Sequence, residues 1–321
     1  MYLKMSSYLV TGIAGFIGSN IARALLAQGA KVRGVDNFVT GKRANLEDLH
    51  GIEMIEGSIE SPEICAKACK GIEYVFHEAA LASVPRSVED PLATNSANVD
   101  GTLNLLMAAR NAGVRRVVYA GSSSAYGDQP TLPKREDMIP DPISPYAVSK
   151  LAGEHYMRSF TRVYGLETVV IRYFNVFGPH QDPSSQYSGV LAKFSLAMLE
   201  DRVPVIFGDG TQSRDFTFID NVVEANLLAM AAPAEKVSGK VFNVATGERI
   251  TLNHAVECLR ELTGYTGKME YTPARTGDIA HSLADISLAR EALGYEPKVS
   301  FREGLRRTIL WYRGLAAATL G

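Results

Sequence analysis

The sequence predicts an α/β fold in which helices cover both faces of a parallel sheet. Short apolar runs alternate with longer helical patterns through the first half of the chain, as in residues 8–12 and 17–29. The runs are apolar at nearly every position, which is typical of strands buried on both faces. Alternation of strand and helix indicates parallel strands joined by crossover helices. We therefore expect a doubly wound parallel sheet.

The predicted elements follow one another in a regular order. Gly29 and Gly113 each stand at the end of a helical pattern, where glycine commonly ends a helix. Pro145 opens a further helix, because proline is well suited to a first helical turn. The expected strands are residues 8–12, 31–36, 53–57, 74–80, 115–123 and 167–173, and the expected helices are residues 17–29, 98–113 and a segment starting near Pro145.

The pattern changes after Asn175. Residues 178–189 are rich in Pro, Gly, Ser and Asp, and are predicted as a long surface loop. The elements beyond this loop are shorter. We expect a main domain over residues 1–175 and a smaller α/β lobe over residues 176–321, with residues 212–250 returning to the main domain.

Composition excludes several classes of function. The chain has 46% hydrophobic and 21% charged residues and a formal net charge of −2, so bulk charge gives no reason to expect nucleic acid or an anionic membrane as a partner. No apolar run approaches the length of a membrane span, and the segment before the first strand is too short for a signal peptide. We expect a cytoplasmic protein. The three cysteines and six histidines fall in no metal-binding spacing, so no metal is expected.

A glycine-rich motif indicates a dinucleotide site. Gly12, Gly15 and Gly18 lie where the first strand gives way to the first helix. Glycines allow a tight turn there, and they let backbone N–H groups approach a pyrophosphate at the helix amino terminus. Asp36 ends the second strand, where a carboxylate binds ribose hydroxyls and repels a 2′-phosphate. The sequence therefore predicts a Rossmann-type domain that prefers NAD to NADP.

A tyrosine and a lysine four residues apart suggest proton chemistry. Tyr146 and Lys150 share one face if their segment is helical, and an ammonium beside a phenol lowers its pKa. This spacing also occurs by chance in many helices. Ser122 strengthens the catalytic interpretation, because it ends a sheet strand at the edge where such sheets bind ligands.

The glycine motif, Ser122, Tyr146 and Lys150 together resemble the extended short-chain dehydrogenase/reductase family. Within it the chain is similar to the nucleotide-sugar 4-epimerases, and the likeness runs from residue 11 to residue 309. The segments that resemble these enzymes are HEAALASVPRSVEDP, SSSAYGDQPTLP, SPYAVSKLAGE, RYFNVFGPHQDP, GDGTQSRDFTFIDNV, FNVATGE and RTGDIAHSLAD.

The resemblance implies a UDP-sugar substrate and inversion of C4 through a transient 4-keto sugar. Tyr146 would take the O4 proton, Ser122 would hydrogen-bond O4, and Lys150 would bind the cofactor ribose and lower the pKa of Tyr146. Residues implied for NAD are Gly12, Gly15, Phe16, Ile17, Gly18, Asp36, Asn37, Ser58, Ile59, Ala79, Ala80, Asn98, Tyr146, Lys150 and Tyr173. Ser58 departs from the family, which usually has an aspartate there.

The resemblance also implies a set of substrate contacts. These are Ser83, Ser122, Ser123, Asn175, Arg214, Arg275, Asp278 and Ser282. In the family, a bulky tyrosine at the place of Ser282 excludes N-acetyl groups, so the small serine favours UDP-GlcNAc and UDP-GalNAc alongside UDP-Glc and UDP-Gal. The weaker alternative is that Ser282 is merely a small packing residue.

Other functions remain open from the sequence. They are a UDP-glucose 4-epimerase restricted to non-acetylated sugars, a UDP-uronic acid epimerase or decarboxylase, and an NAD-binding sensor without turnover. No carboxylate stands among residues 122–125, where related dehydratases and decarboxylases carry one, and this favours epimerisation. By analogy with the family, we expect a homodimer formed through helices near residues 95–112 and 147–164.

Overall fold

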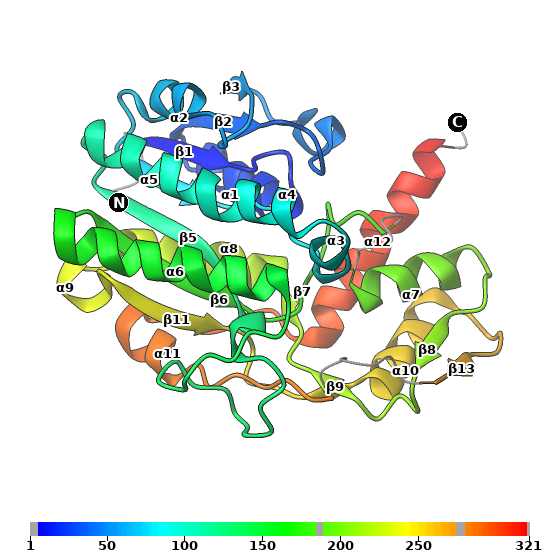
Figure 1. The fold of residues 1–321 in the computed structure, drawn as a ribbon. Coiled ribbons are helices and arrows are strands. Elements are labelled where there is room, and N and C mark those ends of the chain that lie inside the picture. The colour runs from blue at the N-terminus through cyan, green and yellow to red at the C-terminus, as the bar shows by residue number, and fades with distance from the viewer. Residues whose placement is uncertain (1–5, 184–188, 274–279, 320–321) are drawn as a thin grey trace.

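A seven-stranded parallel sheet forms the centre of the computed structural model, which describes residues 6–183, 189–273 and 280–319. The strand order is β11-β6-β5-β4-β1-β2-β3 (Figure 1), and each neighbouring pair is parallel. The predicted α/β fold is confirmed. The strands are β1 (Ser7–Thr11), β2 (Lys31–Asp36), β3 (Ile52–Glu56), β4 (Tyr74–His77), β5 (Arg116–Ser122), β6 (Glu167–Tyr173) and β11 (Lys240–Val244).

The strand order reverses between β1 and β4. The chain runs outward from β1 through β2 and β3, and then returns to place β4 on the other side of β1. Connections leave these two strands in opposite directions, so a crevice opens at their carboxyl ends, where open α/β sheets bind ligands. Thr11 and His77 are paired at this edge. The Thr11 hydroxyl lies 2.8 Å from Nδ1 of His77, whose pKa is lowered to about 3 by burial.

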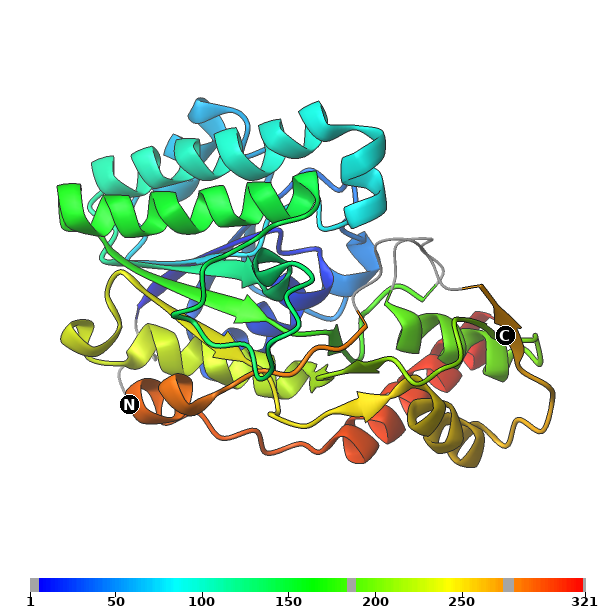
Figure 2. The same cartoon turned by 60° about the horizontal axis from the view of Figure 1, so that its bottom comes forward.

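Helices cover both faces of the sheet (Figures 1 and 2). Alternate strand residues face two separate buried clusters: Leu9 and Val75 belong to one, and Tyr8, Val10 and Phe76 belong to the other. This is the period of two expected of a strand buried on both faces. The first cluster packs under α2 (Pro62–Cys69), α5 (Gly101–Asn111) and α6 (Pro145–Tyr164), and the second under α1 (Phe16–Ala27) and α8 (Ile219–Ala231).

The helix predicted to start at residue 98 starts earlier. Ser83 and Asp90 each cap a short helix through their side chains, and a proline stands in the first turn of both. The second of these helices continues into a π-helical turn and then into α5. The bounds are α3 (Val84–Glu89), α4 (Pro91–Asn95) and η2 (Ser96–Asp100).

Apart from β11 and α8, which belong to the central sheet and its covering helices, much of the second half of the chain forms a smaller group of elements beside the sheet (Figure 2). Its short strands pair as β7 with β10, β9 with β12, and β8 with β13. The strands are β7 (Val176–Phe177), β8 (Val205–Phe207), β9 (Ser213–Arg214), β10 (Thr217–Phe218), β12 (Ile250–Thr251) and β13 (Glu270–Thr272). The remaining helices are α7 (Val190–Leu199), α9 (Ala234–Val237), α10 (Leu252–Thr263), α11 (Ser287–Leu293), α12 (Phe301–Thr319), η1 (Arg43–Leu46) and η3 (Ser123–Tyr126).

Two further features of the described residues concern membrane-spanning helices and cysteines. None of their helices combines the length and apolar character needed to cross a bilayer. The three cysteines, Cys65, Cys69 and Cys258, are buried as free thiols.

Candidate functional site

Gly12 and Gly18, on either side of the turn from β1 into α1, are packed too tightly for any residue but glycine. Gly12 has a φ of +66°, and a Cβ there would lie 2.8 Å from the backbone of Ala79. A Cβ on Gly18 would lie 2.2 Å from the Gly12 carbonyl oxygen. α1 begins after Gly15, and no side chain caps its amino terminus. Unpartnered N–H groups at a helix start favour an anion such as a phosphate.

A small cavity of about 90 Å³ opens beside this loop. It gathers eight of the residues predicted to bind NAD, drawn from the carboxyl ends of β1, β2, β3 and β4. They are Gly12, Gly15, Asp36, Asn37, Ser58, Ile59, Ala79 and Ala80. Because β4 ends at His77, Ala79 and Ala80 leave the strand predicted at 74–80 and line the cavity instead. The residues present therefore fit the nucleotide that the glycine motif predicts.

Asp36 is held rigidly at one end of this cavity. Its carboxylate accepts hydrogen bonds from the N–H groups of Ala14 at 2.9 Å and Phe38 at 2.8 Å. Burial raises the pKa of Asp36, and these backbone hydrogen bonds act in the opposite direction. The carboxylate is thus fixed where a ribose would lie.

Ser58, the departure from the family pattern, also lines the cavity. Its hydroxyl donates to the carboxylate of Glu60 at 2.7 Å. The serine proton therefore goes to Glu60, and the serine oxygen itself accepts from the N–H of Glu60 at 3.2 Å, which leaves one lone pair for a further hydrogen bond.

Asn98 supports the cavity instead of lining it. Its amide oxygen accepts from the N–H of Leu81 at 2.7 Å, and its amide nitrogen donates to the hydroxyl of Ser149 at 2.9 Å. Leu81 itself lines the cavity. Asn98 thus ties the loop after β4 to α6.

Ser122, Tyr146 and Lys150 converge at the carboxyl edge of the sheet. Ser144 caps α6 by accepting from the N–H of Ala147, so Tyr146 lies in the first turn and Lys150 one turn later. The interaction of Ser122 with the Tyr146 phenol lowers the phenol pKa, although burial has the larger effect and raises it. The structure therefore brings together the three residues that the sequence singled out.

Lys150 is anchored at the base of this group. Its ammonium donates to the carbonyl of Ala120 at 2.9 Å and lies 5.0 Å from the centre of the Tyr119 ring. Burial lowers the pKa of Lys150, and the negative charge of Glu78 opposes this shift. The net shift of the Tyr146 pKa is upward, against the lowering expected from Lys150, because burial outweighs the hydrogen bond with Ser122.

Glu78 is a carboxylate in this site that sequence reasoning missed. It follows β4 directly, lines the small cavity, and accepts a hydrogen bond from the Tyr173 hydroxyl at 2.9 Å. Burial raises the pKa of Glu78, and Tyr173 and Lys150 lower it. Its place directly after a buried strand, next to a predicted cofactor residue, was the signal available in the sequence.

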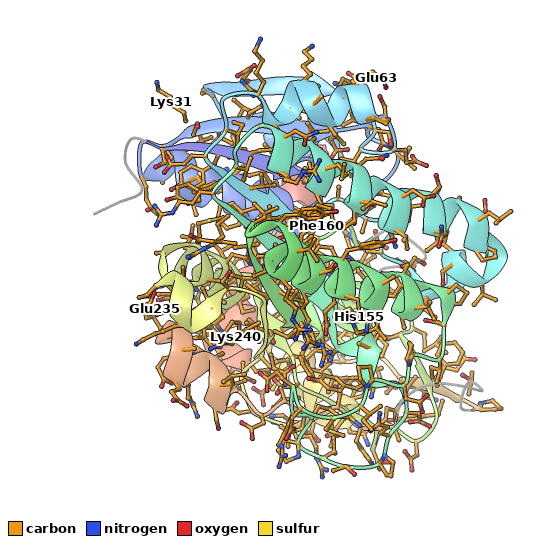
Figure 3. The ribbon with its side chains drawn as sticks, turned by 60° about the vertical axis from the view of Figure 1, so that its left-hand side comes forward. Lys31, Glu63, His155, Phe160, Glu235 and Lys240 are labelled. Carbon is orange, nitrogen blue, oxygen red and sulfur yellow. The ribbon has the colours of Figure 1, made fainter. Side chains whose placement is uncertain are left out.

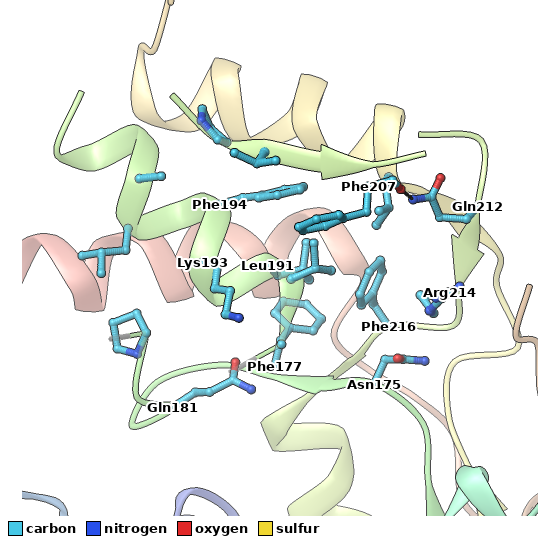
Figure 4. A pocket seen from close by; sticks show the side chains of 18 of the residues that line it. Asn175, Phe177, Gln181, Leu191, Lys193, Phe194, Phe207, Gln212, Arg214 and Phe216 are labelled. Atoms are coloured by element: carbon cyan, nitrogen blue, oxygen red, sulfur yellow. Dashed lines mark hydrogen bonds between the residues drawn. The ribbon is translucent and has the colours of Figure 1, made fainter. Parts of the chain in front are cut away.

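A larger cavity of about 680 Å³ lies between α7 and the short strands β7, β8 and β9. Asn175 and Arg214, both predicted to contact substrate, line it. Figure 4 shows the rings of Phe177, Phe207 and Phe216 gathered along it. Sequence reasoning missed these apolar residues, because single phenylalanines at strand ends look like ordinary core residues. Other lining residues that it missed include Gln181, Leu191, Lys193, Phe194 and Gln212.

Ser282 lies beside Asn175. Its hydroxyl accepts from the amide nitrogen of Asn175 at 3.1 Å and from the N–H of Asp215 at 3.4 Å. The serine is therefore fixed in orientation next to a residue of the large cavity.

The other predicted substrate residues are placed less directly. Ser83 is buried and caps α3 by accepting from the N–H of Arg86 at 3.1 Å. Ser123 begins η3, one residue beyond Ser122. Arg275 and Asp278 lie outside the described residues.

Comparison with known proteins places the chain in a defined group. A model described as the NAD dependent epimerase/dehydratase family matches residues 8–245. The UDP-glucose 4-epimerase of Mycolicibacterium smegmatis is 41% identical over 310 residues, which cover 95% of this chain and 98% of that protein.

Solved structures agree in fold. The UDP-glucose 4-epimerase of Thermotoga maritima, with UDP-glucose, is 41% identical with a TM-score of 0.92, covering 97% of this chain and 99% of that one. The UDP-N-acetylglucosamine 4-epimerase of Methanobrevibacter ruminantium M1, in complex with UDP-N-acetylmuramic acid, is 40% identical with a TM-score of 0.91 and the same coverage.

Proposed function

Because this chain belongs to the NAD dependent epimerase/dehydratase family and is an NAD-dependent isomerase of the UDP-sugar 4-epimerase type, we propose that it interconverts UDP-GlcNAc with UDP-GalNAc, and also UDP-Glc with UDP-Gal. The observation that carries this proposal is the convergence of Ser122, Tyr146 and Lys150 at the carboxyl edge of the sheet. Tyr146 can carry the proton there, and Ser122 and Lys150 support it.

C4 of these sugars bears no acidic hydrogen, so its inversion needs oxidation to a ketone. Bound NAD supplies the acceptor for the hydride from C4 and the source of its return to the other face. Tyr146 takes the O4 proton during oxidation and gives it back during reduction. Ser122 hydrogen-bonds O4, and Lys150 holds a positive charge close to the phenol. No atom is consumed, so the cofactor leaves each cycle in its original state.

The residues before Tyr126 favour epimerisation over elimination. Ser122 and Ser124 have their hydroxyl oxygens 2.8 Å apart, and Ala125 is buried. No carboxylate stands among these four positions to remove a second proton from the sugar or to assist loss of carbon dioxide. A keto sugar formed in this site therefore rotates and is reduced on its other face.

The large cavity is suited to the UDP part of the substrate. Aromatic rings such as Phe207 offer a face on which a base can stack, and Arg214 offers a charge for a diphosphate. We assign cofactor binding to a domain of residues 1–175 that segments of 212–250 rejoin. The rest of residues 176–321 is assigned to binding of the nucleotide sugar. The pairing of β11 with β6 supports this division.

Ser282 supports the acetylated sugars as substrates. A serine leaves room that a tyrosine would fill, and its hydroxyl is directed at Asn175 beside the large cavity. The 40% identity with a UDP-N-acetylglucosamine 4-epimerase adds support. The narrower alternatives are an enzyme for non-acetylated sugars alone and an enzyme for UDP-uronic acids.

Incubation with single substrates tests the proposal. The purified protein is given UDP-GlcNAc, UDP-Glc or UDP-GlcA, and the C4 epimers are resolved by chromatography. We expect conversion of the first two. Conversion of UDP-GlcA alone, release of carbon dioxide, or no conversion by NAD-loaded protein would contradict the proposal.

The outer face of α5 and α6 supports a homodimer. These helices lie next to each other on the surface, and the exposed His155 marks the outward side of α6 (Figure 3). Apolar side chains are exposed on this face, with Val163 at 66% and Val148 at 52%. We expect Val163→Asp to shift the protein toward monomer in analytical ultracentrifugation, whereas Leu288→Asp on α11 does not. A wild-type monomer would contradict the proposal.

A further inference from the structure

Glu78 is an acidic group that the proton transfers described above do not use. It lies at the carboxyl end of β4, next to the switch point of the sheet and behind the glycine loop, where a Cβ on Gly12 would lie 3.0 Å from the backbone carbon of Glu78. Its side chain is partly exposed, and it lines the cofactor cavity. The exposed part of the carboxylate therefore faces space that the cofactor fills.

Hydrogen bonds hold the Glu78 side chain across the sheet edge. The Tyr173 hydroxyl at the end of β6 donates to Glu78 at 2.9 Å, and the amide nitrogen of Asn226 donates to the Tyr173 oxygen at 2.9 Å. Tyr173 and Asn226 are both buried. The Tyr173 side chain thus links the end of β6 to Glu78 at the end of β4, across the intervening strand β5 that ends at Ser122.

The charges around Glu78 come from three elements. Lys150 of α6 is the cation whose charge favours the ionised form of Glu78. Tyr146 of α6, Tyr119 of β5 and Tyr173 of β6 all have pKa values raised by burial and further raised by the negative charge of Glu78. Glu78 is therefore the acidic group that all of these side chains face.

We propose that Glu78 tunes the bound cofactor: its carboxylate faces the nicotinamide end and favours the oxidised, positively charged form over the neutral reduced form. The reacting ring must lie within reach of Tyr146 and Ser122, and the charge of Glu78 acts on Tyr146 and Lys150 at that place. A negative charge at several ångströms in a partly buried site attracts a cation and leaves a neutral ring unaffected.

The consequence for turnover follows from this preference, and this step alone rests on the proposed function. Once a sugar has been oxidised, a site that favours the oxidised cofactor drives hydride back onto the ketone. The ketone then has less time to escape. Glu78 would act on the equilibrium between oxidised and reduced enzyme while Tyr146 moves the proton.

Competition between the two cofactor forms tests the proposal without any sugar. Full-length protein freed of nucleotide is equilibrated with equal amounts of NAD⁺ and NADH, and the bound ratio is measured by absorbance at 340 nm after separation. We expect Glu78→Gln to shift this ratio toward NADH by about tenfold or more. Glu53→Gln, which removes an exposed carboxylate paired with Arg33 on the far side of the sheet, leaves it unchanged.

Two further measurements separate charge from packing. Glu78→Asp keeps the charge, so it retains most of the preference for NAD⁺. In the wild-type protein the preference for NAD⁺ over NADH weakens as the pH falls through the raised pKa of Glu78, because the protonated acid is neutral. In Glu78→Gln the preference does not change over this pH range. These readings hold whichever sugar the enzyme accepts.

The opposite results are equally clear. A folded Glu78→Gln protein with a bound ratio within about twofold of wild type overturns the proposal. Equal weakening of NAD⁺ and NADH binding also overturns it, since that is the mark of a purely structural role. If the glutamine variant does not fold, a bound ratio in wild type that does not change between pH 8 and pH 5.5 overturns it.

Discussion

Replacing Glu154 by glutamine breaks a buried ion pair between α6 and β6. Arg172 donates from Nε to one carboxylate oxygen at 2.9 Å and from Nη2 to the other at 2.7 Å. The side chains of Arg172 and Glu154 are 2% and 4% exposed. Loss of one partner leaves an uncompensated buried charge, which costs about 3–5 kcal/mol.

The size of the expected effect follows from chain length. Unfolding entropy of about 2.1 cal/mol/K per residue gives about 0.7 kcal/mol/K for 321 residues. Glu154→Gln should therefore lower the Tm by about 4–7 °C. Glu53→Gln is the matched control, because the Arg33–Glu53 pair is largely exposed at the glutamate and such pairs contribute about 0–1 kcal/mol.

Differential scanning fluorimetry of the two variants beside wild type measures both shifts. Replacing both partners, as in Glu154→Leu with Arg172→Met, should recover much of the loss, because no unpaired charge then stays buried. A Tm for Glu154→Gln within 1–2 °C of wild type, or equal shifts in both single variants, would refute the reasoning.

Three other predictions concern the site. Tyr146→Phe should reduce turnover by about 10²–10⁴-fold while the protein still carries NAD, measured by epimer formation and by released nucleotide; near-normal turnover would show that another group moves the proton. Ser282→Tyr should abolish turnover of UDP-GlcNAc and spare UDP-Gal, measured with each sugar separately; equal loss on both would remove Ser282 as the determinant. Asp36→Asn should weaken the preference for NAD over NADP by removing the charge that repels a 2′-phosphate, measured by isothermal titration; an unchanged preference would place the selectivity elsewhere.

Much of the sheet and the proton-transfer group could be predicted from the sequence, because each depends on local patterns. Apolar runs and glycine ends define the strands and helices. Tyr146 and Lys150 share a face because their spacing matches one helical turn.

The rest depends on contacts between distant segments. Glu78 meets Tyr173, 95 residues later, and the sequence gives no local pattern for such a contact. Asp215 is similar: its carboxylate accepts from Thr246 and Gly247 of one segment and from Ala284 of another, and the sequence shows these segments only as separate motifs. The direction of the Tyr146 pKa shift was also wrong at the sequence level, since spacing reveals a neighbouring lysine but does not reveal burial.

Asn98 links the outer helices to the nucleotide loop. It stands in the π-helical turn that leads into α5, and it holds both Leu81 and Ser149 of α6. A second subunit packed on α5 and α6 would stabilise the position of this asparagine. Dimer formation and binding of the cofactor would then strengthen each other. Dilution of such a protein would then release nucleotide as well as separate subunits.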